Sequence, residues 1–105
     1  MIAAAPPPPA RVQVVAREFT LTLSRATLPS GRAIVELVNF GEDAHDLRLQ
    51  QSGGGAVYAW ATDQPGGVED KLVKLAPGRY VLWCSLAGHR ALGMVATLRV
   101  VRRRS

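Results

Sequence analysis

Three side chains with soft donor atoms lie close together near the C-terminal end of the sequence. The stretch CSLAGHRALGM contains Cys84, His89 and Met94, with four residues in each gap. A thiolate, an imidazole and a thioether suit copper better than a hard cation, and two histidines, a cysteine and a weak axial methionine form the blue-copper electron-transfer arrangement. The second histidine must be His45, since the sequence has only two. These residue types predict a copper site.

The residues around these donors alternate in polarity as β-strands do. His45 and the leucines that follow it alternate with polar residues, which predicts a strand that directs His45 toward the core. In RYVLWC, Cys84 shares a face with Tyr80 and Leu82. Both donors would therefore lie at the ends of strands on core-facing positions.

Length and charge exclude several classes of protein. The chain has 105 residues, 48% of them apolar, which is enough for one domain with a buried core. No apolar run approaches the roughly 18 residues of a membrane span. The net charge is +5, but the arginines are dispersed apart from Arg102–Arg104 and are not interleaved with aromatic residues. We expect no nucleic-acid ligand, and we interpret the charge as a solvated surface that favours an acidic protein partner.

The chain divides into three segments. Residues 1–10 are rich in alanine and proline and predict an extended polyproline II spacer. Residues 11–102 form the expected copper-binding domain, and residues 103–105 form a basic tail. The spacer fits the start of a mature protein whose signal peptide or membrane anchor lies outside this chain. An ordinary frayed terminus explains it about as well.

Short alternating stretches separated by turn residues fill the central segment. Seven or eight such strands, with no helical period, predict an all-β fold, an antiparallel Greek-key β-sandwich. Tyr80 follows Pro77 and Gly78 and is typical of a tyrosine corner, whose hydroxyl bonds to nearby backbone. Residues 52–67 fit either an edge strand with loops or a turn of helix.

The sequence resembles the cupredoxins, a family of small blue copper proteins. The resemblance runs through NFGEDAHDL and APGRYVLWCSLAGHRALGM to the closing strand, and the ligand loop is most similar to those of rusticyanin and sulfocyanin. It implies His45, Cys84 and His89 as copper ligands with Met94 as the axial ligand. It also implies a β-sandwich and one-electron transfer by copper that cycles between Cu(I) and Cu(II). We expect a monomer outside the cytoplasm, in the periplasm or at the cell surface.

The same residues disfavour other copper centres and enzymatic activity. A dinuclear centre like that of the second subunit of cytochrome oxidase would need a second cysteine in the ligand loop, and Cys84 is the only cysteine. Trinuclear oxidase sites need further histidines, and both histidines are already used. We therefore expect one copper ion per chain and no catalysis. A bound metal would also cap a lone thiol in an oxidising compartment.

One position departs from the family pattern. In plastocyanin and azurin an asparagine follows the first histidine ligand, whereas this chain has Asp46. An aspartate can accept a hydrogen bond from backbone near Ser85, and its negative charge would stabilise the oxidised site. Asp46 and Ser85 are therefore expected to form a hydrogen bond that holds the two ligand segments together without contacting the metal.

Small or apolar residues surround His89 in the ligand loop. We expect them to be partly exposed and to form a collar that suits brief docking of a redox partner, such as a cytochrome or a terminal oxidase or reductase. A plain loop packed on the end of the sandwich explains them nearly as well. The collar residues are Leu86, Ala87, Ala91 and Leu92.

Two other functions remain open at this point. A copper chaperone or storage protein would need an exchangeable site that favours reduced copper. A cysteine hydrolase or thiol peroxidase would use Cys84 with a histidine as base. No resolving cysteine or clear oxyanion site accompanies Cys84. Intense colour with Cu(II) would argue against the first alternative, and thiol reactivity with and without copper would test the second.

Overall fold

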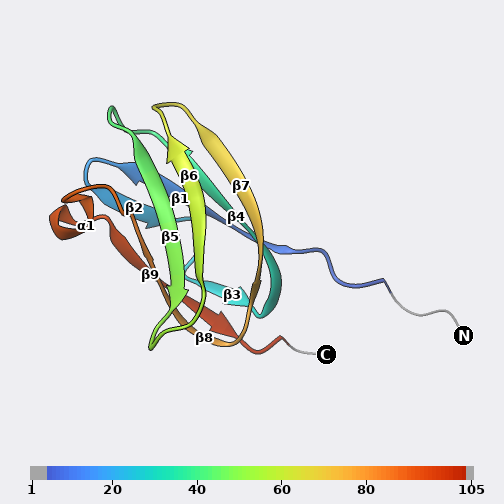
Figure 1. The fold of residues 1–105 in the computed structure, drawn as a ribbon. Coiled ribbons are helices and arrows are strands. Elements are labelled where there is room, and N and C mark those ends of the chain that lie inside the picture. The colour runs from blue at the N-terminus through green and yellow to red at the C-terminus, as the bar shows by residue number, and fades with distance from the viewer. Residues whose placement is uncertain (1–4, 104–105) are drawn as a thin grey trace, which may run out of the picture.

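The structure is a computed structural model that describes residues 5–103, and in this range it contains nine strands and one short helical turn (Figure 1). The first four residues of the expected N-terminal spacer and the last two of the basic tail lie outside the described residues. No helix within residues 5–103 has the length and apolar character needed to cross a membrane. The elements are β1 (Ala10–Arg17), β2 (Thr20–Leu23), β3 (Thr27–Pro29), β4 (Gly31–Asn39), β5 (His45–Gln51), β6 (Val57–Asp63), β7 (Val68–Leu75), β8 (Gly78–Trp83), α1 (His89–Leu92) and β9 (Val95–Val101).

The strands form two packed sheets, with the orders β2-β1-β4-β7 and β3-β9-β8-β5-β6. The β-sandwich expected from the sequence is confirmed, but its sheets are mixed and its described part has nine strands instead of seven or eight. β1 pairs in parallel with β4, and β3 pairs in parallel with β9. Between β2 and β4 the chain crosses to the other sheet to form β3, so β4 returns beside β1 in the same direction. β3 has only three residues, too few to show an alternating pattern.

The core lies between the sheets and follows the alternation of the strands. Trp60 of β6 is 2% exposed, and its Nε1 donates a hydrogen bond to the carbonyl oxygen of Val35 in β4 at 3.1 Å, which links the two sheets. Residues 57–63 are thus an edge strand, one of the two possibilities for this part of the sequence. The buried residues contributed by β1, β4, β5 and β8 include Val12, Val14, Ala16, Ala33, Val35, Leu37, Leu47, Leu49, Tyr80 and Leu82.

Tyr80 closes the connection between β7 and β8 as a tyrosine corner does. Its hydroxyl donates a hydrogen bond to the carbonyl oxygen of Ala76 at 2.9 Å, and the side chain is 4% exposed. This contact fixes the start of β8, the strand that leads to Cys84. It therefore helps to hold one of the predicted ligands in place.

Candidate metal centre

His45, Cys84 and His89 cluster at the start of α1, and α1 lies at one end of the sandwich (Figure 1). His45 begins β5, Cys84 directly follows β8, and His89 begins α1. β5 and β8 are antiparallel neighbours, so the start of one lies beside the end of the other. The Nδ1 atoms of the two histidines are 3.3 Å apart, and His89 Nδ1 lies 3.6 Å from Cys84 Sγ. The sandwich thus brings the three predicted donors to one point.

The geometry and chemistry of these donors fit a copper ion. The three donor atoms all lie within 4.8 Å of one another. Donors bound to one ion at roughly 2.0–2.3 Å are separated by up to about twice that distance. Two imidazoles and a thiolate are soft ligands that suit copper. His45 and Cys84 are fully buried, so no bulk water competes for these positions.

Burial raises the pKa of the Cys84 thiol above its ordinary value. A free thiol in this position would stay protonated, which is the opposite of what a nucleophilic cysteine requires. A bound metal ion removes the proton from a coordinating thiol. The environment of Cys84 therefore favours a metal ligand over the nucleophile of a hydrolase or peroxidase.

Backbone hydrogen bonds hold Met94 beside two of the other predicted ligands. The N–H of Cys84 donates to the carbonyl oxygen of Met94, and the N–H of Met94 donates to that of His89, each at 3.1 Å. The Met94 side chain is fully buried. Gly93 precedes Met94 and has a φ of 129°, which favours glycine. A Cβ at this position would also lie only 2.8 Å from the carbonyl oxygen of Phe19. The two ends of the ligand loop, Cys84 and Met94, are therefore joined by a backbone hydrogen bond.

Asp46 is buried, although the alternation of β5 pairs it with the polar, outward positions. Its Oδ1 accepts a hydrogen bond from the Ser85 N–H at 2.6 Å, and its Oδ2 accepts one from the Ser85 hydroxyl at 2.5 Å. The register of β5 and β8 pairs Arg48 with Trp83, which places Asp46 and Ser85 side by side just beyond that pair. The Arg48 guanidinium lies 3.0 Å from Asp46 and compensates its charge. The expected contact between Asp46 and Ser85 is therefore present.

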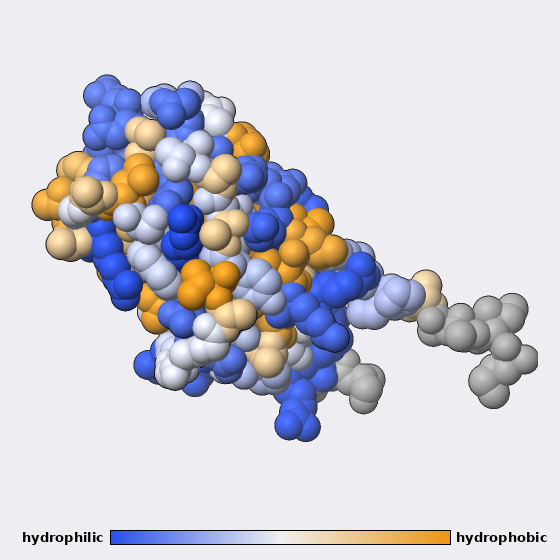
Figure 2. All heavy atoms as spheres, viewed as in Figure 1, coloured by the Kyte–Doolittle hydropathy of each residue, from blue (hydrophilic) through white to orange (hydrophobic). Residues whose placement is uncertain are grey.

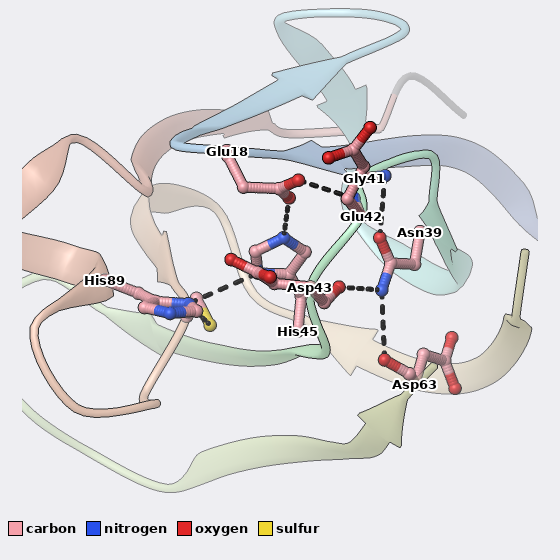
Figure 3. Close-up of polar contacts among 9 residues, drawn as sticks. Glu18, Asn39, Gly41, Glu42, Asp43, His45, Asp63 and His89 are labelled. Atoms are coloured by element: carbon pink, nitrogen blue, oxygen red, sulfur yellow. Dashed lines mark hydrogen bonds and ion pairs between the residues drawn. The ribbon is translucent and has the colours of Figure 1, made fainter. Parts of the chain in front are cut away.

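Glu18, in the turn between β1 and β2, contacts His45 from the other side of the ring and has no counterpart in the sequence prediction. Its Oε2 lies 2.5 Å from His45 Nε2, and its Oε1 accepts a hydrogen bond from the Glu42 N–H at 2.5 Å (Figure 3). The Glu42 N–H, followed by the contact with His45, holds the pKa of the Glu18 carboxyl below its usual value. The ring of the adjacent Phe19 packs against the His89 ring in a T-shaped arrangement, with centroids 5.1 Å apart. One turn thus contacts both histidines.

Asn39 braces the loop that leads from β4 to His45. Its Nδ2 donates to the carbonyl oxygens of Asp43 and Asp63 at 2.8 and 3.0 Å, and its Oδ1 accepts from the Gly41 N–H at 2.8 Å (Figure 3). The side chain is fully buried, and these three bonds use both its amide hydrogens and its oxygen. Asn39 therefore fixes the loop between β4 and β5, whose backbone contacts Glu18. No spacing or motif in the sequence marks either Glu18 or Asn39.

The predicted collar residues lie on the surface around the ligand loop. Leu92 is 61% exposed, Ala87 and Ala91 are exposed, and Leu86 is half-buried against the core. Figure 2 shows apolar side chains gathered at this end of the molecule. A hollow of about 560 Å³ beside Cys84 is lined by Trp83, Ser85, Leu86, Ala87, Gly88, Arg90 and Ala91. The Arg90 guanidinium lies over the Trp83 ring, 4.8 Å from its centroid.

The fold is shared with solved structures of copper proteins. An auracyanin from the photosynthetic bacterium Roseiflexus castenholzii matches with a TM-score of 0.74 and 21% identity, over 88% of this chain and 97% of that one. Auracyanin A from Chloroflexus aurantiacus, described as a "blue" copper protein, matches with a TM-score of 0.69 and 13% identity, over 89% and 99%. Rusticyanin from Thiobacillus ferrooxidans matches with a TM-score of 0.67 and 16% identity, over 86% and 77%.

Larger copper proteins contain a similar domain. A copper-containing nitrite reductase from Thermus scotoductus matches with a TM-score of 0.57 and 21% identity, over 98% of this chain but 24% of that one. No protein-family model and no curated protein sequence matches the chain. At these identities the likeness establishes the fold. The resemblance to the cupredoxins is therefore confirmed, and the chain has the cupredoxin fold.

Proposed function

We propose that this protein is a mononuclear blue copper protein that carries single electrons between redox partners. The observation that carries the proposal is the convergence of one donor atom each from His45, His89 and Cys84 within 4.8 Å of one another, with His45 and Cys84 fully buried. With Met94 as a further, weak donor, these residues would hold a copper ion as a blue-copper ligand set. A bound copper ion would supply the one-electron chemistry by cycling between Cu(I) and Cu(II). The sequence has two histidines and one cysteine, so this set can form only once, which supports one ion per chain.

The chain's own contribution is to hold the ligands still. Asp46 ties the start of β5 to Ser85 by two hydrogen bonds, and backbone hydrogen bonds connect Met94 with Cys84 and His89. Ligands that move little between two oxidation states keep the reorganisation cost of electron transfer low. Full burial of His45, Cys84 and Met94 also limits the access of water to the site.

The exposed collar around His89 supports docking of a redox protein. Apolar side chains at the edge of the site suit a small, short-lived interface. Arg90 and the net charge of +5 favour an acidic partner, such as a cytochrome or a terminal oxidase or reductase. We place this monomeric carrier outside the cytoplasm, in the periplasm or at the cell surface, where copper would also protect the single thiol from oxidation.

A copper titration tests the proposal. Addition of Cu(II) to the metal-free protein should produce an intense visible absorption band that saturates at one equivalent and is bleached reversibly by a reductant. Two copper ions per chain, or zinc retained in preference when both metals are offered, would contradict a single blue site. Tight binding of Cu(I) with no colour in the presence of Cu(II) would instead identify a chaperone or a store.

A further inference from the structure

The imidazole of His45 is contacted at both of its nitrogen atoms. Nδ1 faces the Nδ1 of His89 at 3.3 Å, whereas Nε2 lies 2.5 Å from Oε2 of Glu18 (Figure 3). The ring is fully buried, so this carboxylate is the hydrogen-bond partner that the fold provides at Nε2. We propose that Glu18 is a positioning residue of the copper site. Its carboxylate accepts the Nε2 hydrogen of His45, which leaves the Nδ1 lone pair free for the metal and makes the imidazole a stronger donor.

Contacts with the loop that follows β4 hold the Glu18 carboxylate in this position. Oε1 accepts the Glu42 N–H, and the carboxylate lies so close to Gly41 that a Cβ added there would overlap it. Asn39 fixes the same loop through three hydrogen bonds. The Glu18 side chain is therefore fixed by the Glu42 N–H, by His45 Nε2 and by its tight packing on Gly41. A surface glutamate would keep its freedom of rotation.

A carboxylate is the one side-chain group of this size that satisfies both neighbours. Two N–H donors, from Glu42 and His45, point at its two oxygens, and each oxygen accepts one of them. A glutamine at position 18 has one oxygen and one NH₂ group. If its oxygen faced Glu42, the NH₂ group would face His45 Nε2 and favour the tautomer that carries its hydrogen on Nδ1. The proposed metal-binding nitrogen would then be blocked.

The charge of Glu18 has a second consequence, which rests on the proposed copper function. The charge of Asp46 is compensated by Arg48 at 3.0 Å, whereas the only ion-pair partner of Glu18 within residues 5–103 is His45 itself. Its negative charge therefore acts on the ligand and favours Cu(II) over Cu(I). Glu18 should lower the reduction potential of the site.

The test compares Glu18→Gln with Glu42→Gln. Both variants lose one negative charge near the same loop, but Glu42 contributes only its backbone N–H to the contact, so its variant is the matched control. Glu18→Gln should bind Cu(II) about 10- to 100-fold more weakly, as is typical when a hydrogen-bond partner of a metal ligand is changed. Its affinity for Cu(I) should fall less. Each tenfold loss that is specific to Cu(II) raises the potential by about 59 mV. Glu42→Gln should keep wild-type values.

A second measurement needs no copper. Nitrogen-15 NMR of the metal-free wild-type protein, which reports the hydrogen on each ring nitrogen, should show the His45 hydrogen on Nε2, the atom that faces Glu18. Glu18→Gln should shift the hydrogen toward Nδ1. A wild-type His45 protonated on Nδ1 would overturn the proposal even if the variant failed to fold.

The outcomes separate this inference from the proposed function. If the wild-type protein forms no blue site, the proposed function fails, and the tautomer of His45 still tests the role of Glu18. If the wild type is blue and Glu18→Gln keeps its affinities, potential and tautomer, Glu18 merely fastens the loop and the inference is wrong.

Discussion

Cys84 and Met94 are both fully buried at the ends of the ligand loop, yet their sulfur atoms should contribute differently to the site. A thiolate makes a strong bond to Cu(II) and produces the intense charge-transfer colour. A thioether in the axial position is a long, weak donor. The two residues are tied to each other through the hydrogen bond from the Cys84 N–H to the Met94 carbonyl oxygen, which substitution of either side chain leaves in place.

Substitution of the two proposed sulfur ligands should therefore give opposite results. Cys84→Ser should abolish the blue band even if some copper still binds. Met94→Leu, which nearly conserves volume, should keep the colour and raise the reduction potential, because donation to the oxidised metal is lost. Absorption spectra and voltammetry of the copper-loaded variants measure both effects. Equal bleaching in both variants would show that the axial assignment is wrong.

The two histidines belong to elements with different access to solvent. His45 starts β5, is fully buried and has Glu18 behind it. His89 starts the short turn α1 on the surface and is only partly buried. A side chain removed from the turn leaves a gap that is open to solvent, whereas one removed from the strand leaves a closed cavity.

Variants that lack one of the two imidazoles should therefore differ in how well added imidazole restores the blue colour. Added imidazole should restore blue colour to copper-loaded His89→Gly, because the ligand can enter from the surface. His45→Gly should be rescued at least about tenfold less effectively, since the strand and Glu18 close the path. Titration of each variant with imidazole, followed by absorption, gives the two concentrations for half-maximal rescue. Similar concentrations would contradict the assignment of the exposed and buried edges.

At the scale of the whole molecule, the proposed copper site joins segments far apart in the chain. His45 and His89 are separated by 44 positions and Glu18 and His45 by 27, and all lie at one end of the sandwich. The unfolded chain cannot hold these groups at bonding distance from one ion. A metal that binds only the folded arrangement stabilises that arrangement by mass action.

Copper loading should therefore raise the Tm. Free copper at about 100 times its Kd stabilises the folded protein by about 2.7 kcal/mol. For a domain of this size, that corresponds to a rise of roughly 10–20 °C. Calorimetry of the metal-free and copper-loaded protein measures the shift, and Cys84→Ser serves as the control with a smaller shift. Identical melting of both forms of the wild type would mean that the four residues do not form a preorganised site.

The sequence by itself determined the donors of the site and the class of fold. Only two histidines and one cysteine are available, and Cys84, His89 and Met94 lie at loop spacing, so a blue-copper site had to bring His45 together with them. Alternating polarity identified most strands, because a strand with one buried face repeats every two residues. Tyr80 identified the corner before Cys84.

Only the tertiary structure decided which distant segments meet. The parallel pairs β1–β4 and β3–β9, the burial of Asp46 and the edge strand β6 depend on how the chain crosses between sheets. The contact of Glu18 with His45 spans 27 positions and involves a residue type that is common on surfaces. Alternating polarity shows that a segment forms a strand, and motif spacing shows which residues lie close together in the sequence. They contain no information about long-range pairing, because that pairing depends on the packing of all the strands together.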